Sequence, residues 1–284
     1  MSVISTQQIT KAMKMVAAAK LRRAQDRIIQ MRPYANKLSI ILSNVSAGVE
    51  DDLTNVYAEQ RPVEKVLLVV ISSDRGLCGA FNSSVFKGTL ARIEEKYKEQ
   101  QETGDVSVLP IGKKAHDYFK KRSYNLIDDY ANLFGDLNFD DSRKAAEAAM
   151  DGFKNGEFDV VELIYNEFKN VATQILRTQQ FLPVVPQENG TEIEQSNIDY
   201  IFEPSKETIV KELIPKSLKV GFYKALLESN ASEQGARMTA MDKATENASE
   251  LLKELRLTYN RTRQAAITKE ILEIVGGAEA LSNN

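Results

Sequence analysis

Residues 226–281 read LLESNASEQGARMTAMDKATENASELLKELRLTYNRTRQAAITKEILEIVGGAEAL and contain no proline. Apolar or small side chains recur here at alternating steps of three and four, which places them on the narrow seam of a coiled-coil helix. Gln234 is the one position that breaks this seam. The seam residues are Ala231, Met238, Met241, Thr245, Ala248, Leu252, Leu255, Tyr259, Thr262 and Ala266.

This helix is too long to be buried inside its own domain. About 55 helical residues form a rod of ~80 Å. A compact chain of 284 residues has a radius of gyration of only ~19 Å. We therefore expect the helix to project from the protein and to pack against a partner.

A second long helix is predicted over residues 1–47. Its seam keeps its register across Pro33, so we expect a bend there and not an end, although proline usually kinks or stops a helix. Met13 and Ala17 continue the stripe upstream. Neither helix buries its seam alone, so the two chain ends should pair, with Ile28 facing a residue between Met241 and Leu255. The first seam consists of Leu21, Ala24, Ile28, Met31, Ala35, Leu38, Leu42 and Val45.

The middle of the chain has a different pattern. Lys65–Ile71 is a nearly continuous apolar run, typical of a strand buried on both faces. Strands alternate with helices up to a predicted antiparallel hairpin of Phe158–Phe168 and Thr173–Val185, which indicates an α/β sheet covered by helices. We expect Pro215 to mark the junction into the long C-terminal helix.

The predicted fold class is α/β, with a long antiparallel coiled coil of the N- and C-terminal helices and an inserted Rossmann-like α/β domain. The expected domains are an N-terminal coiled-coil helix (1–58), a central α/β domain (59–205) and a C-terminal coiled-coil helix (206–284).

Composition excludes several kinds of site. A single cysteine, Cys78, leaves no disulfide framework and no thiol cluster for zinc. The single histidine, His116, lies among lysines, and we interpret it as a surface residue. No apolar run approaches the ~20 residues that span a bilayer. We find no catalytic constellation, cofactor motif or metal site.

The turn Ser72–Gly79 is the element most like an enzyme's, because a glycine turn between strand and helix can hold phosphate. It matches neither common phosphate-binding motif, and Asp74 places negative charge where a phosphate would lie. A structural or partner-facing turn is favoured over a ligand site. Cys78 is interpreted as a packed thiol and not as a nucleophile.

The first helix is basic, with eight Lys and Arg residues against Asp26 within residues 1–49. Three interpretations are open: a solvated helix face, a shaft that meets acidic partner surface, or a nucleic-acid site. The near absence of aromatic residues for base stacking argues against nucleic acid.

Several motifs coincide with one known family. Residues 9–21, ITKAMKMVAAAKL, resemble the N-terminal helix of the gamma subunit of F-type ATP synthase, and residues 73–79, SDRGLCG, are similar to its central-domain turn. The segments 236–248 and 259–270 resemble its C-terminal helix. The motifs lie in the family's order and cover both ends and the middle of the chain.

The resemblance implies a non-catalytic central rotor shaft. In the family, the helix pair lies in the axis of a ring of alternating alpha and beta subunits, and the α/β domain lies with the epsilon subunit and the membrane c-ring. ATP chemistry belongs to the beta subunits. The implied location is peripheral, on the cytoplasmic face of a bacterial inner membrane, with no membrane-spanning segment and no nucleic-acid partner.

The resemblance also implies partner-contacting residues. Arg75 and Cys78 would lie on the central turn near the foot of the shaft. We call the contacts with the surrounding ring of alpha and beta subunits the collar contacts. They would come from Met13 and Lys14 on the first helix, and from Arg237, Arg263, Gln264, Thr268 and Glu270 on the second.

Two alternatives stay open from the residues alone. One is a nucleotide-binding α/β enzyme that dimerises through coiled-coil arms. The other is a plain coiled-coil scaffold, which leaves the inserted α/β domain unexplained. The basic segment Lys11–Arg27 continues the seam, so we interpret it as mature structure and not as a transit peptide.

Overall fold

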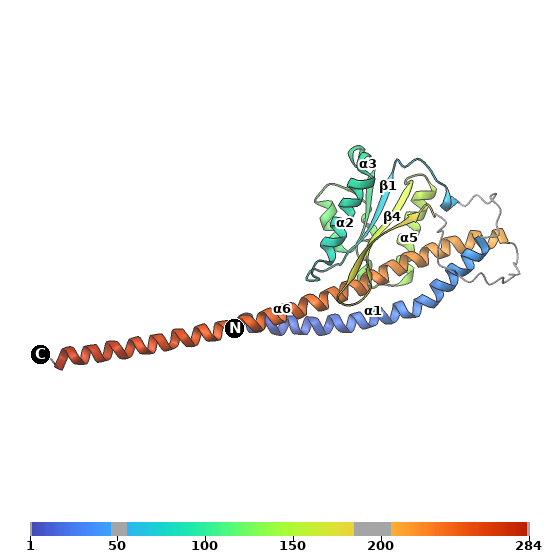
Figure 1. Cartoon of the computed structure of the whole chain (residues 1–284). Coiled ribbons are helices and arrows are strands. Elements are labelled where there is room, and N and C mark those ends of the chain that lie inside the picture. Colours follow the sequence, from blue (N-terminus) through green and yellow to red (C-terminus); the bar gives the residue numbers. More distant parts are fainter. Residues whose placement is uncertain (1, 47–55, 185–205, 283–284) are drawn as a thin grey trace.

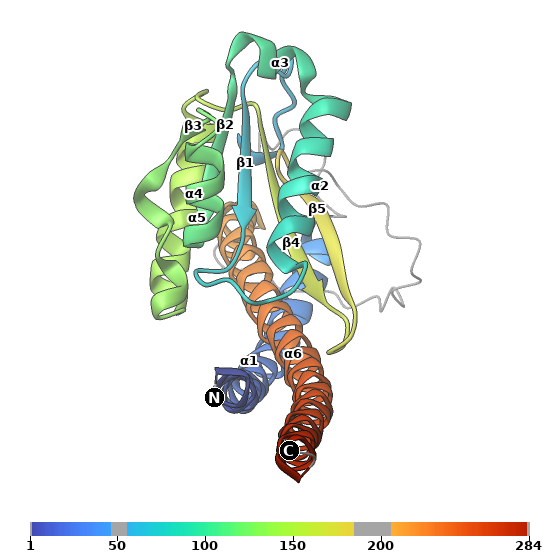
Figure 2. The same cartoon turned by 90° about the vertical axis from the view of Figure 1, so that its left-hand side faces the viewer.

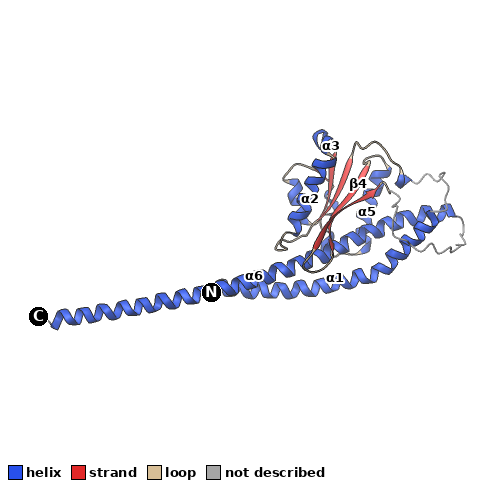
Figure 3. Cartoon of the chain, viewed as in Figure 1, coloured by secondary structure: helices blue, strands red, loops and turns tan. Residues whose placement is uncertain are grey.

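A computed structural model describes residues 2–46, 56–184 and 206–282. Two long helices, α1 (Ser2–Ser46) and α6 (Lys206–Ser282), run side by side, and an α/β domain lies against them (Figures 1 and 3). This confirms the predicted fold class. The domain boundaries expected at 58/59 and 205/206 stay a prediction.

The two helices pair in antiparallel fashion. Near the start of α1, the Thr245 hydroxyl donates to Thr10 Oγ1 over 2.8 Å, and Gln7 Nε2 donates to Ser249 Oγ over 2.6 Å. Among the side chains that the structure describes, the buried seam residues are Ala17, Leu21, Ala24, Ile28, Leu38, Ala231, Met241 and Ala248; those of the predicted seam residues Leu42 and Val45 lie outside this set. The predicted pairing of the two chain ends is therefore confirmed.

The predicted register of Ile28 was wrong. Ile28 lies beside Leu227 and Lys224, whereas the predicted segment Met241–Leu255 lies beside the first turns of α1. A seam repeats every three or four residues, so its period is compatible with many offsets between two helices. The offset is set by where the inserted domain holds each helix.

Pro33 and Pro215, the two prolines discussed above, both lie inside helices. α1 continues through Pro33, as predicted, and is bent in Figure 1. α6 continues through Pro215, so the predicted junction was wrong. Proline removes one hydrogen bond and crowds the preceding turn. Around Pro215, α6 is held against its neighbours because Ile214 and Val220 are buried.

The central domain contains a five-stranded sheet in the order β3-β2-β1-β4-β5. β1, β2, β3 and β4 are parallel, and β4 and β5 form the predicted antiparallel hairpin. The strands are β1 (Val66–Ile71), β2 (Val106–Ile111), β3 (Asn125–Leu126), β4 (Val160–Phe168) and β5 (Gln174–Leu182). The helices are α2 (Phe81–Lys96), α3 (Lys98–Thr103), α4 (Lys113–Lys120) and α5 (Phe139–Lys154), with short 3-10 turns at Val56–Ala58, Asp128–Tyr130 and Leu133–Gly135.

β1 is buried on both faces because helices cover both sides of the sheet (Figure 2). On one face of β1, Leu68 packs with residues of α2 and α4, as do Val66 and Val70. On the other face, Val69 packs with residues of α5 and α6, as do Leu67 and Ile71. Residues of α1 join this second core. The sheet thus anchors the N-terminal half of α6, while the C-terminal part of this helix projects away.

The projecting part of α6 extends beyond the start of α1 (Figure 1). Leu255 is 50% exposed and Tyr259 is 66% exposed. We expected these residues in the seam that α1 covers. In the described structure the seam contacts end near Leu252, so the predicted intramolecular seam is too long by several turns.

Candidate partner-binding site

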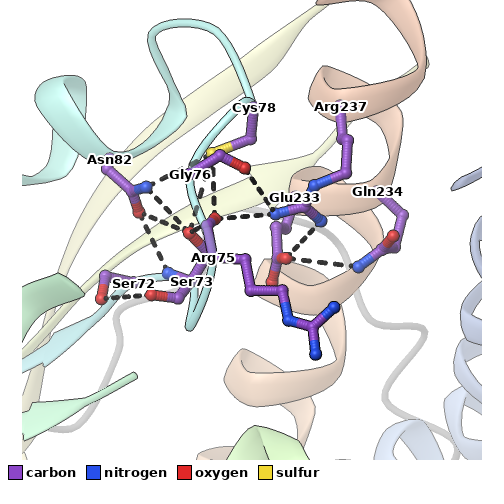
Figure 4. Close-up of polar contacts among 9 residues, drawn as sticks. All are labelled: Ser72, Ser73, Arg75, Gly76, Cys78, Asn82, Glu233, Gln234 and Arg237. Carbon is purple, nitrogen blue, oxygen red and sulfur yellow. Dashed lines mark hydrogen bonds and ion pairs between the residues drawn. The ribbon is translucent and has the colours of Figure 1, made fainter. Parts of the chain in front are cut away.

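The turn between β1 and α2 is closed by its own hydrogen bonds (Figure 4). Ser73 N donates to Asn82 Oδ1 over 3.0 Å, and Ser73 Oγ donates to Arg75 O over 2.7 Å. Asn82 Nδ2 also lies 3.3 Å from Cys78 Sγ. These side chains hold the loop in one shape, and Asp74 Oδ1 accepts from Lys113 N at the neighbouring strand end.

Gly79 allows this turn to approach the shaft. Its φ of +59° is a conformation that L side chains rarely adopt. A Cβ added at Gly79 would lie 3.9 Å from the Ala240 Cβ, so the turn and α6 are already in close contact. The SDRGLCG motif therefore serves a packing role between the sheet and α6.

Arg237 of α6 joins the shaft to this turn. Its Nη2 donates to Arg75 O over 2.9 Å and lies 3.4 Å from Gly76 O, and its Nη1 forms an ion pair with Glu233 one helical turn earlier (Figure 4). Burial raises the pKa of Glu233, and the charge and hydrogen bond of Arg237 oppose that rise. The guanidinium thus satisfies a buried carboxylate and two main-chain carbonyls together.

The structure brings three of the predicted site residues together here: Arg75, Cys78 and Arg237. The side chain of Arg75 is exposed, whereas Cys78 packs against Phe81 and Ala236 and is 2% exposed. The interpretation of Cys78 as a packed thiol is confirmed. Contacts of these three residues with a partner stay a prediction.

Met13 and Lys14 form a second group, on the helix pair. Met13 is half-buried. Lys14 Nζ forms an ion pair and hydrogen bond with Asp242 Oδ1 of α6. Part of the basic charge of α1 is therefore used within the shaft, which the sequence did not predict, because Asp242 is 228 residues away.

The remaining predicted residues lie apart from both groups, on the projecting part of α6. Arg263, Gln264, Thr268 and Glu270 are all exposed. The Thr268 hydroxyl donates to Gln264 O, a contact within the helix itself. Large apolar side chains accompany them: Leu257, Tyr259, Ile267, Ile271, Leu272, Ile274 and Val275 are each at least 48% exposed. Exposed apolar surface of this extent is typical of interaction sites, and the contacts of Arg263, Gln264, Thr268 and Glu270 with a partner stay a prediction.

Sequence reasoning missed the buried polar residues of α6. Glu228, Ser229, Ser232 and Glu233 are all at least 94% buried where the helix passes under the sheet. Only one signal was available, the spacing of four residues between Glu233 and Arg237, which is typical of a helical ion pair. Helical periodicity alone does not reveal that this polar face is covered by another element.

The described residues hold no group of three or more His, Cys, Asp or Glu side chains arranged to bind a metal ion. Over the same ranges, no helix has the length and hydropathy to cross a bilayer. His116 is more enclosed than predicted: its side chain is 23% exposed, with Nε2 3.4 Å from Asp128 Oδ1 and Nδ1 3.5 Å from Asp117 Oδ1.

These features define a class of protein: a two-helix shaft, extended by a bare helical tip, that carries an α/β domain at its side. The profile of the family described as ATP synthase matches residues 1–281. A relative from Cytophaga hutchinsonii, named "ATP synthase gamma chain", is 62% identical over 283 residues, which is 99% of this chain and 96% of that protein. The chain belongs to the gamma chain family of ATP synthases.

Solved structures share the fold. The central stalk and c-ring structure of the Tetrahymena thermophila mitochondrial ATP synthase contains a chain with a TM-score of 0.57 and 26% identity, covering 84% of this chain and 99% of that one. The rotor of the Euglena gracilis mitochondrial enzyme contains a chain with a TM-score of 0.60 and 24% identity, covering 94% of this chain and 95% of that one.

Proposed function

We propose that this chain is the non-catalytic central rotor shaft of a bacterial F-type ATP synthase. The observation that carries the proposal is the tip of α6, a single helix that exposes both apolar residues such as Leu257 and polar residues such as Arg263. A bare helix of this composition needs a surrounding protein surface. The ring of alpha and beta subunits supplies that surface in the family to which the chain belongs.

A single shaft inside a three-fold ring offers a simple mechanism. One chain does not share the symmetry of the ring, so the three beta sites meet different faces of the shaft. Different contacts favour different conformations of each site. As the shaft turns, each site passes through open and closed states. Proton flow in a transmembrane field, worth ~2.3 kcal/mol per charge per 100 mV, drives the turning.

The proposed collar contacts follow from position and exposure. Arg263, Gln264, Thr268 and Glu270 lie on the exposed tip, where a ring would enclose them. Met13 and Lys14 lie nearer the α/β domain. We propose that the α/β domain at the other end lies with epsilon and the c-ring, on the cytoplasmic face of the inner membrane.

The proposed lack of a catalytic site is tested on the isolated chain. With ATP and magnesium, turnover should not exceed that of buffer, and equilibrium dialysis should detect no stoichiometric nucleotide binding. Binding accompanied by hydrolysis would favour the alternative of a nucleotide-binding enzyme with coiled-coil arms.

The proposed collar contacts are tested in a reconstituted complex. Arg263→Ala with Gln264→Ala should weaken assembly with the ring and lower coupled ATP synthesis, because hydrogen bonds to charged groups contribute about 1.5–3 kcal/mol each. The matched control is Lys243→Ala with Glu246→Ala, two exposed residues beside the two-helix part of the shaft. Equal synthesis rates for both variants and the parent would remove Arg263 and Gln264 from the site.

A further inference from the structure

A cavity of about 880 Å³ lies between α1, α5 and the early part of α6. It is separate from the turn at Ser72–Gly79 and from the tip of α6. Its volume falls within the range of ~300–1,000 Å³ that is usual for small-molecule sites. The residues that decide its chemistry are Arg27, Tyr34, Phe139, Arg143, Lys216 and Tyr223.

The lining carries an excess of positive charge. Four basic residues line the cavity, Arg27, Arg143, Lys216 and Lys219, against one acidic residue, Glu212. Outside the lining, the Glu147 carboxylate is shared by Lys219, at 2.6 Å, and by Arg143, at 3.7 Å. One carboxylate does not neutralise two cations, so the cavity favours an anion.

Two of these cations keep part of their side chains exposed. The Arg143 side chain is 44% exposed, although its Nε is itself buried and lies 3.7 Å from Glu147 Oε1, beyond hydrogen-bond distance. Lys216 is exposed, and no described residue forms an ion pair with it. Hydrogen bonds from a cation to an ionised acceptor are the stronger ones. An anionic group between the exposed parts of these two side chains would give both of them such an acceptor.

Three aromatic residues, Tyr34, Phe139 and Tyr223, also line the cavity, beside aliphatic and amide side chains. Phe139 is 38% exposed and Tyr34 is 47% exposed. Tyr223 meets the Phe139 ring edge to face, with centroids 5.5 Å apart. Exposed aromatic faces beside cations provide a place for an apolar group joined to an anionic one.

We propose that this cavity binds an amphipathic organic anion, with a phosphate head held by Arg143 and Lys216 and an apolar part packed on Phe139, Tyr34 and Tyr223. An anionic phospholipid and a soluble alkyl phosphate share this chemistry. A ligand here would touch α1, α5 and α6 together, and would therefore strengthen the attachment of the α/β domain to both shaft helices.

The test is calorimetric titration of the full chain with n-decyl phosphate below its critical micelle concentration. We expect one saturable site, about tenfold weaker binding in Arg143→Gln with Lys216→Gln, and weaker binding in Phe139→Ala. The matched control is Lys154→Gln with Lys211→Gln, which removes the same charge from exposed positions of α5 and α6 outside the lining. The control should bind like the parent chain.

Three outcomes would overturn the proposal: no saturable binding, equal binding of neutral n-decyl maltoside, or equal weakening in the control. Nanodiscs containing phosphatidylglycerol or only phosphatidylcholine identify the source. Selective binding to phosphatidylglycerol nanodiscs that depends on Arg143 and Lys216 supports a membrane lipid. Binding of decyl phosphate without nanodisc binding supports a soluble anion.

Discussion

Arg237 of α6 donates a hydrogen bond of 2.9 Å to the main-chain carbonyl of Arg75, 162 residues earlier in the chain. This contact fastens the shaft to the turn that ends β1. The same guanidinium is the ion-pair partner of the buried Glu233. One side chain therefore couples the sheet, the turn and the helix.

Arg237→Ala should destabilise the protein. The substitution removes the ion-pair partner of the buried Glu233 carboxylate and one donor from the carbonyls of Arg75 and Gly76, so we expect a loss of about 2–4 kcal/mol in the free energy of unfolding. Urea unfolding followed by circular dichroism measures this loss. Lys243→Ala, at an exposed position of the same helix, is the control and should change stability little. Adding Glu233→Gln to Arg237→Ala should recover part of the loss.

Cys78 reports on the same contact. Its thiol is 2% exposed, so it should react slowly with N-ethylmaleimide in the native protein and rapidly in urea. Arg237→Ala should speed labelling under native conditions, because the turn is released from α6. Unchanged labelling and unchanged stability would mean that the Arg237 contact does not hold the turn.

The register of the helix pair can be measured by crosslinking. In a Cys78→Ser background, Thr10→Cys with Thr245→Cys should form an intramolecular disulfide, because the two hydroxyl oxygens are 2.8 Å apart. Ile28→Cys with Met241→Cys is the control and should not crosslink. By the register of Thr10 with Thr245, these positions are offset by about 20 Å along the helix axis at ~1.5 Å per residue. Crosslinking of the control pair would refute the register.

Glu228 should make stability depend on pH. Burial raises the pKa of this carboxyl, although a hydrogen bond from Phe168 N and the charges of Arg32 and Lys224 oppose the rise, and Glu167 adds to it. The folded state then holds its proton more tightly than the unfolded state. The stabilisation is present below the unfolded pKa and is lost as pH rises through the folded pKa.

Glu228→Gln removes this dependence and keeps an acceptor for Phe168 N. The variant should gain stability relative to the parent chain as pH is raised from 4.5, the ordinary pKa of glutamate, to 8. Urea unfolding at a series of pH values gives the comparison, with the exposed Glu246→Gln as control. A constant difference between Glu228→Gln and the parent at every pH would contradict the role given to Glu228.

The sequence predicted what local periodicity determines. The seam around Leu21 and Ile28, and the apolar run of β1, follow from which side chains face one direction, so the helix pair and the buried strand were predicted correctly. Pro33 was also predicted correctly, since the seam continues past it. Pro215 was not, because the support from buried Ile214 and Val220 arises only when α6 meets the rest of the protein.

Long-range relationships could not be predicted in this way. The offset that places Ile28 beside Leu227 depends on the inserted domain. Asp242 as the partner of Lys14, and the burial of Glu233, depend on contacts between distant segments. For the site, sequence motifs indicated Arg75, Cys78 and Arg237, but only the three-dimensional arrangement shows that they meet in one intramolecular contact.

The pairing of α1 with α6 has a consequence for synthesis in the cell. Lys14 and Asp242 are 228 residues apart, so the apolar seam of α1 leaves the ribosome long before its partner exists. At translation rates of about 5–20 residues per second, the wait lasts roughly 10–45 s. During that time α1 is an unpaired amphipathic helix on a growing chain. The nascent protein therefore needs either a chaperone or early burial of this seam against the α/β domain.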